Sequence, residues 1–448
     1  MSEDKKTDRF YKRGYDYNSR KPLFIDSDSL TETQINRLTN SKSFCMLPWV
    51  HQHAYPDGRV YPCCFAEYFH PIGNLKNNTM REVWNQEGYK EIRRSMLEDK
   101  PVKQCTKCYE QEANGFFSMR YDANRSYGHN IAEVDKTLPD GTHPEFKIRY
   151  WDVRFSNLCN FRCRTCGPVF SSNWYNDHVK LFNRVPDVNG KDLARIEYAA
   201  GDEEHMIRQM EEHIPYLEQV YFAGGEPLIM KEHYYLLEKL IEAGRTDVCI
   251  QYNTNFSELA FKDKHVFEYW KHFRTVGVGA SLDASGARAE LMRKGTDWKQ
   301  TVRNRERMLE EVPHVDFYIA STISAMNVLH ILDFHKEWVD MGFIKPKDFN
   351  VNICQSPEWY RIDLFPQEFK ERVIKPAYEQ HIEWLEPQDS LKRATTGFKS
   401  AINFLMATDG TQHWNKFRQE IELLDNLRGE NFWSTFPELN ELKINDIT

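Results

Sequence analysis

The sequence predicts an α/β fold in which parallel strands alternate with helices, and three observations support it. Short apolar runs typical of strands recur between residues 148 and 353, and helical sequence lies between them. An irregular, cysteine-rich segment precedes this alternation, and mainly helical sequence follows it. Such alternation favours parallel strands joined by right-handed crossovers. The pattern alone leaves open whether the units form a partial barrel or a doubly wound sheet.

Four regions follow one another along the chain. Residues 1–43 are polar without clear periodicity, which predicts a tail or an arm packed on the surface. Residues 44–146 are irregular and contain one expected helix at 80–97. Residues 147–365 carry the strand–helix alternation, and residues 366–448 form a helical C-terminal extension.

The expected strands are short runs rich in β-branched and aromatic residues. They lie at residues 148–155, 218–222, 247–252, 275–282, 317–323 and 349–353. The main expected helices lie at residues 233–243, 299–310, 328–341, 367–384, 397–406 and 416–427. Because ligands of such folds bind at the carboxyl ends of the strands, residues just beyond each strand are the functional candidates.

Composition excludes several classes of protein. The chain has 448 residues, of which 40% are hydrophobic and 14% aromatic, so it can bury a core and is not a disordered chain. A net charge of −8 leaves no basic surface for a nucleic acid, which is not expected as a partner. The charged N-terminus lacks the apolar region of a secretory signal, and we find no apolar run long enough to span a membrane. These features predict a cytoplasmic protein.

Cysteine spacing is the most informative feature of the sequence. Eight of the ten cysteines lie between positions 45 and 166, and clustered cysteines in a large chain indicate metal rather than disulfides. Cys159, Cys163 and Cys166 directly follow the first expected strand, with C-x3-C-x2-C spacing. Soft thiolates suit an iron–sulfur cluster or zinc, but a structural zinc site would need a fourth ligand. Three cysteines on a cubane cluster would instead leave one iron open.

This loop resembles the hallmark of the radical S-adenosylmethionine (radical SAM) enzymes, and the resemblance covers about residues 147–355. It implies a partial (β/α)6 barrel and a [4Fe–4S] cluster that chelates SAM at its open iron. The reduced cluster would cleave SAM to methionine and a 5′-deoxyadenosyl radical. Thr165 departs from the family pattern, which often has an aromatic residue before the third cysteine.

Further landmarks of the family lie at later strand ends. Gly224, Gly225, Glu226 and Pro227 follow the second strand, where the family receives the methionyl amino group of SAM. Glycines allow close approach of backbone to a ligand, and a carboxylate suits an ammonium group. The family's ribose and carboxylate contacts resemble residues that follow the third and fourth strands, namely Asn255, Ser281, Asp283 and Arg293.

A second set of cysteines lies upstream of the alternation. Gly58 stands four intervening residues before Cys63, and Cys45, Cys105 and Cys108 flank this segment. The arrangement resembles the SPASM and twitch auxiliary domains of radical SAM enzymes, here placed before the barrel instead of after it. The resemblance implies one fully ligated auxiliary [4Fe–4S] cluster. Since no further cysteines lie between Cys108 and the barrel, the shorter twitch-like form is favoured.

Three alternatives stay open in this region. Cys64 competes with Cys63 as a ligand, although the glycine spacing favours Cys63. Four cysteines would also satisfy tetrahedral zinc. His51 and His53 have strand spacing and would face the same side, and we expect them to be polar surface or hydrogen-bonding residues and not ligands.

The resemblance predicts an enzyme whose 5′-deoxyadenosyl radical abstracts hydrogen from a substrate C–H bond. Oxidation of a small polar molecule is favoured, with a peptide-modifying maturase or a non-catalytic cluster scaffold as alternatives. A flavodoxin or ferredoxin would supply electrons, and the auxiliary cluster would accept or relay one. Cys354, at the end of the last strand, is a candidate hydrogen-atom donor, although unpaired cysteines are more often buried core residues.

Overall fold

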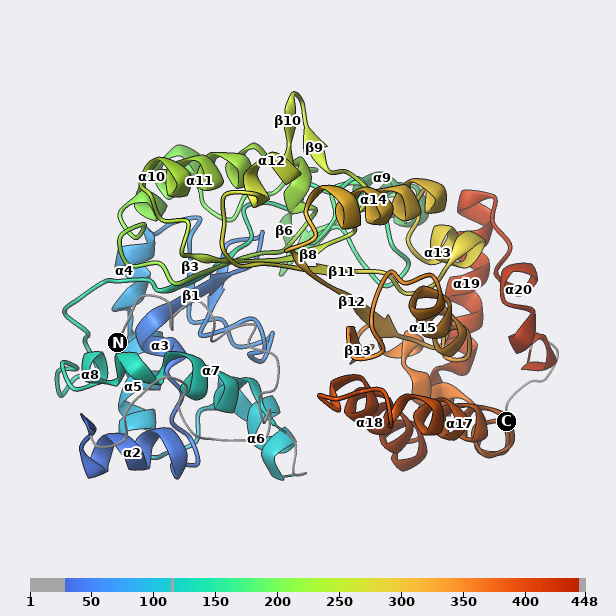
Figure 1. Ribbon diagram of the computed structural model, residues 1–448, viewed down its shortest axis with the longest axis horizontal. Coiled ribbons are helices and arrows are strands. Elements are labelled where there is room, and N and C mark those ends of the chain that lie inside the picture. Colours follow the sequence, from blue (N-terminus) through green and yellow to red (C-terminus); the bar gives the residue numbers. More distant parts are fainter. Residues whose placement is uncertain (1–28, 114–116, 443–448) are drawn as a thin grey trace. The chain divides into compact units, whose positions relative to one another are not determined.

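A computed structural model describes residues 29–113 and 117–442, which belong to two compact units (Figure 1). Part of the predicted N-terminal tail, residues 1–28, lies outside the described residues. The first unit comprises Met1–Asn157, Ile196–Gln251 and Lys264–Val276. The second unit comprises Leu158–Arg195, Tyr252–Asp263 and Gly277–Thr448. The four-region division predicted from the sequence stays a prediction.

The first unit has a mixed sheet in which the cysteine-rich segment supplies three strands. Its strands in spatial order are β7 (Gln219–Phe222), β4 (Tyr150–Val153), β1 (His51–Ala54), β2 (Arg59–Tyr61) and β3 (Gly73–Asn74). Strand β1 pairs in parallel with β4, so that His53 lies opposite Asp152, and β2 pairs antiparallel with β1. The sheet therefore continues from the expected first barrel strand into the cysteine-rich segment, which the sequence did not predict.

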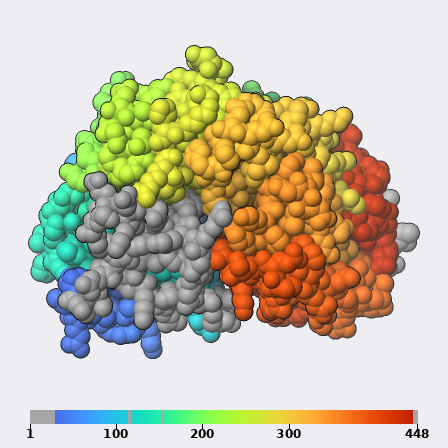
Figure 2. Space-filling model, viewed as in Figure 1, coloured from blue at the N-terminus to red at the C-terminus, as the bar shows by residue number. Residues whose placement is uncertain are grey.

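Helices surround this sheet. They are α2 (Glu32–Thr39), α3 (Leu47–Val50), α4 (Met80–Trp84), α5 (Glu87–Leu97), α6 (Thr106–Ala113), α7 (Met119–Tyr127), α8 (Ile131–Val134), α10 (Glu203–Glu211), α11 (Lys231–Glu242) and α12 (Val266–Trp270). Figure 1 draws α10 and α11 on one side of the strands and α3 and α7 on the other. The space-filling view in Figure 2 shows α10 and α11, in green, at the surface.

One local prediction for this unit was wrong, and one element was not predicted. The helix expected at 80–97 is two helices, because the Asn85 side chain bonds outside the helix, donating to the His143 carbonyl at 2.9 Å. The described part of the expected tail contains α2, which begins at a capping box formed by Thr31 and Gln34. A capping box satisfies two backbone N–H groups, so this start signal was present in the sequence.

The second unit contains the later parallel strands and the C-terminal helices. Strands β12 (Asp316–Ile323) and β13 (Phe349–Ile353) are parallel, and β11 (Val276–Ala280) pairs in parallel with β12. The expected strands at 317–323 and 349–353 are confirmed. Strand β8 (Cys249–Thr254) has residues in both units. Short two-residue strands complete the description: β5 (Asp187–Val188), β6 (Lys191–Asp192), β9 (Ala260–Phe261) and, in the first unit, β10 (Lys264–His265).

The helices of the second unit are α9 (Trp174–Phe182), α13 (Gly286–Met292), α14 (Trp298–Glu311), α15 (His330–Asp340), α16 (Gln367–Phe369), α17 (Lys375–Leu385), α18 (Arg393–Ala407), α19 (Trp414–Arg428) and α20 (Phe432–Thr435). In this unit α14, α15, α18 and α19 lie close to predicted helices, the helix expected at 367–384 is divided, and α9, α13 and α20 were not predicted. A π-helical segment, Lys370–Ile374, divides α16 from α17. The prediction of an α/β fold with parallel strands and a helical C-terminal part is confirmed. Among the described residues, no helix combines the length and apolarity needed to cross a membrane.

Candidate functional site

The loop that carries Cys159, Cys163 and Cys166 belongs to the second unit and is fixed by its own backbone. The Cys166 N–H donates to the Cys163 carbonyl at 3.1 Å and closes a tight turn. The Cys159 N–H donates to the Ser172 hydroxyl at 3.2 Å, and the Trp174 indole N–H donates to the Cys163 carbonyl at 2.7 Å. All three cysteine residues are half-buried. The start of α9 thus holds the loop in place.

The segment that follows α13 supports the same loop from another side. The Arg164 N–H donates to the Met292 carbonyl at 2.8 Å, and the Arg162 N–H donates to the Lys294 carbonyl at 2.9 Å. Gly295 has φ +119°, and a Cβ there would lie 2.7 Å from the ring of Phe161. Only glycine adopts this backbone and this close approach without strain.

Two of the predicted SAM contacts, Asp283 and Arg293, lie beside the cysteine loop. The Arg293 Nη1 lies 3.9 Å from the Cys163 sulfur, and its Nε donates to Asp283 Oδ2 at 2.7 Å. The other oxygen of Asp283 accepts from the Thr322 N–H at 2.8 Å. Burial raises the pKa of the Cys163 thiol, and Arg293 acts in the opposite direction. Burial also raises the pKa of Cys166, to about 12. A buried guanidinium therefore favours the thiolate form that ligates iron.

Asn255, another predicted contact, bonds directly to the loop. Its Nδ2 donates to Asn160 Oδ1 at 2.8 Å, and Asn160 Nδ2 donates to the Ser257 hydroxyl at 2.9 Å. The predicted contact Ser281 is half-buried, and its N–H donates to the Thr254 carbonyl at 2.7 Å. Asn255 thus ties the end of β8 to the cysteine loop.

Gly224, Gly225, Glu226 and Pro227 belong to the first unit. The two glycines have φ values of +79° and +53°, which side chains rarely adopt. Glu226 is fully buried, and its Oε1 accepts from the Leu228 N–H at 3.1 Å, so it caps the short helix that begins at Pro227. The segment has the close-approach backbone that its sequence predicted.

Sequence reasoning missed the charged contacts between the C-terminal extension and the cysteine loop. The fully buried Arg164 side chain donates from Nη2 to Glu430 Oε2 at 2.6 Å and also to Asp425. Arg428 Nε donates to Asp177 of α9 at 3.0 Å. In the sequence these charges resemble an ordinary solvated helix face, so nothing local marks them as partners of the loop.

The second set of cysteines lies in the first unit. Burial raises the pKa of Cys63 most, and the charges of Cys64, Cys108, Cys105 and Cys45, in that order, raise it further. Burial likewise raises the pKa of Cys105 to about 12 and of Cys108 to about 11. The backbone at the start of α7 acts in the opposite direction on Cys108 and lowers its pKa. The assignment of Cys45, Cys63, Cys105 and Cys108 as ligands stays a prediction.

Cys64 also lies near the Asp152 carboxylate. Its pKa is raised to about 12, first by burial and then by that charge. His51 and His53 are fully buried, so the expectation of a polar surface was wrong for them, because β1 is covered on both faces. Hydrogen bonding is confirmed for His51, whose Nδ1 lies 2.8 Å from the Tyr150 carbonyl. His53 Nδ1 lies 2.8 Å from Asp152 Oδ2.

Comparisons with known families match two parts of the chain. Residues 153–330 match the radical SAM superfamily, and residues 45–109 match SPASM, an iron–sulfur cluster-binding domain. The SPASM match precedes the radical SAM match along the chain, in the order that the sequence predicted. The two matches imply a SAM-binding [4Fe–4S] cluster with SAM, and an auxiliary iron–sulfur cluster.

Solved structures similar to the chain include native anSMEcpe with bound AdoMet, with 18% identity, a TM-score of 0.35 and coverage of 53% of this chain and 59% of that one. Streptococcus suis SuiB bound to the precursor peptide SuiA shares 14% identity, with a TM-score of 0.36 and coverage of 66% and 64%. TYW1 with a lysine-pyruvate adduct shares 10% identity, with a TM-score of 0.26 and coverage of 55% and 72%. The chain thus spans less than two thirds of the length of anSMEcpe and SuiB. A search among curated proteins finds no match.

The residues present fit these cofactors. Three thiols share one loop, the charges of Cys45, Cys105 and Cys108 act on Cys63 in the first unit, and sulfur is the donor that iron–sulfur clusters take. Within the described residues, no group of three or more His, Cys, Asp or Glu side chains is arranged to hold a single metal ion. Each iron of a cluster takes its own thiolate, so a cluster does not require such an arrangement.

Proposed function

We propose that the chain is a radical SAM enzyme, in which SAM is reductively cleaved and hydrogen is then abstracted from a substrate C–H bond. When bound, the reduced cluster supplies the electron for this cleavage, and the 5′-deoxyadenosyl group carries the radical. The observation that carries the proposal is a loop of three cysteines, one fewer than a closed cluster needs, bordered by Asp283 and Arg293.

The chain's own residues would hold and tune the cluster. Cys159, Cys163 and Cys166 are the proposed ligands. The Arg293 guanidinium, fixed by Asp283, offsets thiolate charge at Cys163. A buried cation beside a cluster is one of the protein's means of setting its reduction potential.

The Gly-Gly-Glu segment would bind the ammonium group of SAM. The Glu226 carboxylate is fully buried and is oriented by the Leu228 N–H, which fixes it as an acceptor. A buried carboxylate and an ammonium group form a strong charge-assisted contact. Ser281 and Asn255 remain proposed contacts to the other polar groups of SAM.

In the SPASM domain we propose Cys45, Cys63, Cys105 and Cys108 as the ligands of one auxiliary [4Fe–4S] cluster, in a twitch-like form. The charges of Cys45, Cys105 and Cys108 all act on Cys63, and the spacing from Gly58 favours Cys63 over Cys64, whose charge acts on it too. With four thiolates no iron is open, so the cluster would transfer an electron and would not bind substrate. This fits a net oxidation of a small polar molecule in the cytoplasm, with a flavodoxin or ferredoxin as the external donor.

Cys354 remains a proposed hydrogen-atom donor. Burial raises its pKa to about 12, so it stays a thiol near neutral pH, which such a donor requires. Its Sγ lies 3.6 Å from the Ser356 carbonyl. Asp283 also raises this pKa through its charge.

Anaerobic reconstitution followed by iron and sulfide quantitation tests the proposal. With dithionite and SAM, the wild-type chain should form 5′-deoxyadenosine, measured by liquid chromatography and mass spectrometry. Cys163→Ala should abolish it, whereas Cys249→Ala, which removes a buried cysteine outside both sets, should retain it. Zinc in place of iron at the loop, or wild-type protein that forms no 5′-deoxyadenosine, would contradict the proposal and favour a non-catalytic scaffold. A modified peptide as the turnover product would favour a maturase.

A further inference from the structure

One face of the first unit's sheet is polar although it is buried. Register partners on neighbouring strands point to the same side of a sheet, and here His53 lies opposite Asp152, which lies opposite Tyr221. His51 and Tyr150 form the preceding pair. Buried polar groups cost free energy unless they are paired or serve a ligand. This row of side chains is therefore a candidate binding site.

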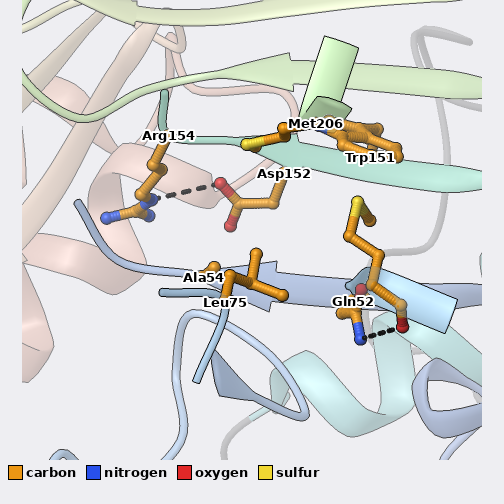
Figure 3. A pocket seen from close by; sticks show the side chains of 8 residues that line it. Gln52, Ala54, Leu75, Trp151, Asp152, Arg154 and Met206 are labelled. Atoms are coloured by element: carbon orange, nitrogen blue, oxygen red, sulfur yellow. Dashed lines mark hydrogen bonds and ion pairs between the residues drawn. The ribbon is translucent and has the colours of Figure 1, made fainter. Parts of the chain in front are cut away.

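Arg154, which directly follows β4, contacts this row through Asp152. Its Nε donates to Asp152 Oδ1 at 3.1 Å, as Figure 3 shows, and its guanidinium lies 5.2 Å from the Tyr55 ring centre. The second oxygen of Asp152 faces His53 at 2.8 Å. Within residues 29–113 and 117–442, the structure gives the two terminal nitrogens of Arg154 no acceptor. The outer edge of the guanidinium thus presents donors that no described residue uses.

The positive charge of Arg154 is balanced by the negative charge of Asp152. Burial lowers the pKa of His51 to about 4 and also lowers that of His53, so both rings are neutral near pH 7. Asp152 is negative near pH 7. Burial raises its pKa, but its charged neighbours, with Arg154 foremost, lower the pKa by more. One buried cation and one buried anion remain. Asp152 accepts only from the Nε of Arg154. The two terminal nitrogens of the guanidinium therefore remain to donate in parallel to another oxyanion.

Arg154 also contacts the Gly-Gly-Glu segment. A Cβ at Gly224 would lie 3.1 to 3.3 Å from the Cβ, Cγ and Cδ atoms of Arg154, so the arginine side chain packs against that glycine. Gly224 belongs to the segment for which we propose SAM binding. A ligand group bound by Arg154 would consequently lie beside SAM, where a substrate must be placed for hydrogen abstraction.

We propose that Arg154 binds an oxyanion of the substrate, a carboxylate or a phosphate, and so selects small anionic molecules. That the anion belongs to a substrate rests on the proposed function, whereas the binding of an anion by Arg154 does not. A planar guanidinium fork matches both oxyanions in a bidentate way, and both are common on small polar metabolites. The carboxylate of SAM has the same chemistry, so the experiment must distinguish it from a substrate group.

Binding of inorganic phosphate and of succinate to the anaerobically reconstituted full chain tests the site. At constant ionic strength, we expect saturable binding of at least one anion by calorimetry and a matching rise in Tm. Arg154→Gln should weaken that binding tenfold or more. Arg81→Gln, which removes an exposed arginine of the same unit, should leave it unchanged. Arg154→Lys keeps the positive charge but lacks the two parallel N–H donors of the guanidinium. This variant should bind the anion more weakly than wild type, even if the glutamine variant is unstable.

The outcomes separate the possible sources of the anion. SAM affinity that stays within twofold of wild type in Arg154→Gln supports a substrate group. Loss of SAM affinity in that variant would overturn the proposal in favour of the carboxylate of SAM, and so would wild-type protein that binds neither anion. If wild type binds an anion through Arg154 but forms no 5′-deoxyadenosine from SAM, the proposed function fails while the anion site stands.

Discussion

The two cysteine sets of this chain are held in different ways. Cys159, Cys163 and Cys166 lie within eight residues on one partly exposed loop, and distant side chains fix that loop. The auxiliary cysteines come from widely separated positions between 45 and 108, and the charges of Cys45, Cys105 and Cys108 act on the Cys63 thiol. Local spacing is thus sufficient to bring the first set together, whereas the second set requires the folded SPASM domain. The comparison predicts different consequences when each set is disturbed.

The largest difference should appear when one ligand is removed from each set. Cys163→Ala should abolish 5′-deoxyadenosine, because the loop has no spare thiol. Cys105→Ala with Cys108→Ala should leave SAM cleavage detectable and abolish product, because the auxiliary cluster would act after cleavage. Iron and sulfide content should fall by one cluster in each case. Full turnover by the double variant would show that the auxiliary cluster has no part in the reaction.

The next difference concerns the neighbouring residues Cys63 and Cys64. Cys63→Ala should lose the auxiliary cluster, since the spacing from Gly58 favours it as the ligand and the charges of Cys45, Cys105 and Cys108 act on its thiol. Cys64→Ala should retain it, because the main charge that acts on the Cys64 thiol is that of Asp152. Iron content and the electron paramagnetic resonance spectrum of the reduced protein measure this. If Cys64→Ala lost the cluster and Cys63→Ala retained it, Cys64 would be the ligand instead of Cys63.

A smaller effect should follow from removing the C-terminal partners of the loop. Asp425→Asn combined with Glu430→Gln leaves the buried Arg164 without a counter-charge. Breaking a buried ion pair by removing one side costs about 3 to 5 kcal/mol of unfolding free energy, which denaturant titration can measure. As a control, Glu441→Gln removes the partner of the exposed Arg372 and should cost less than about 1 kcal/mol. Equal costs would mean that the extension does not stabilise the loop through charge.

The smallest effect concerns pH and the first unit. Burial, followed by the hydrogen bond that protonated Glu232 donates to Glu203, raises the pKa of Glu232 from 4.5 to about 7. Between these values the folded protein binds more protons than the unfolded chain, so this contribution to stability is complete below pH 4.5 and is lost as the pH rises through 7. Glu232→Gln should therefore flatten the decline of Tm between pH 5 and 8. An unchanged pH profile would show that Glu232 ionises normally.

Several features could be predicted because their signals are local. The strands β12 and β13 are continuous apolar runs, and the cysteine loop is a short motif of fixed spacing. The choice of Cys63 over Cys64 also had a local signal, the spacing from Gly58, although the ligand assignment is a proposal. The break at Asn85 was missed because the amide bonds to His143, far along the chain. The helical periodicity of the sequence cannot by itself reveal such a competing hydrogen-bond partner.

The amino-acid sequence by itself determined which elements form and which cysteines are candidates, because periodicity, caps and motif spacing act within a few residues. Only the tertiary structure decided that β1 pairs with β4, that Asp425 and Glu430 neutralise Arg164, and that Arg154 lies against Gly224 and Asp152. Strand pairing and buried ion pairs join residues that are often more than a hundred positions apart. Their free energy depends on burial and distance, which no local pattern encodes.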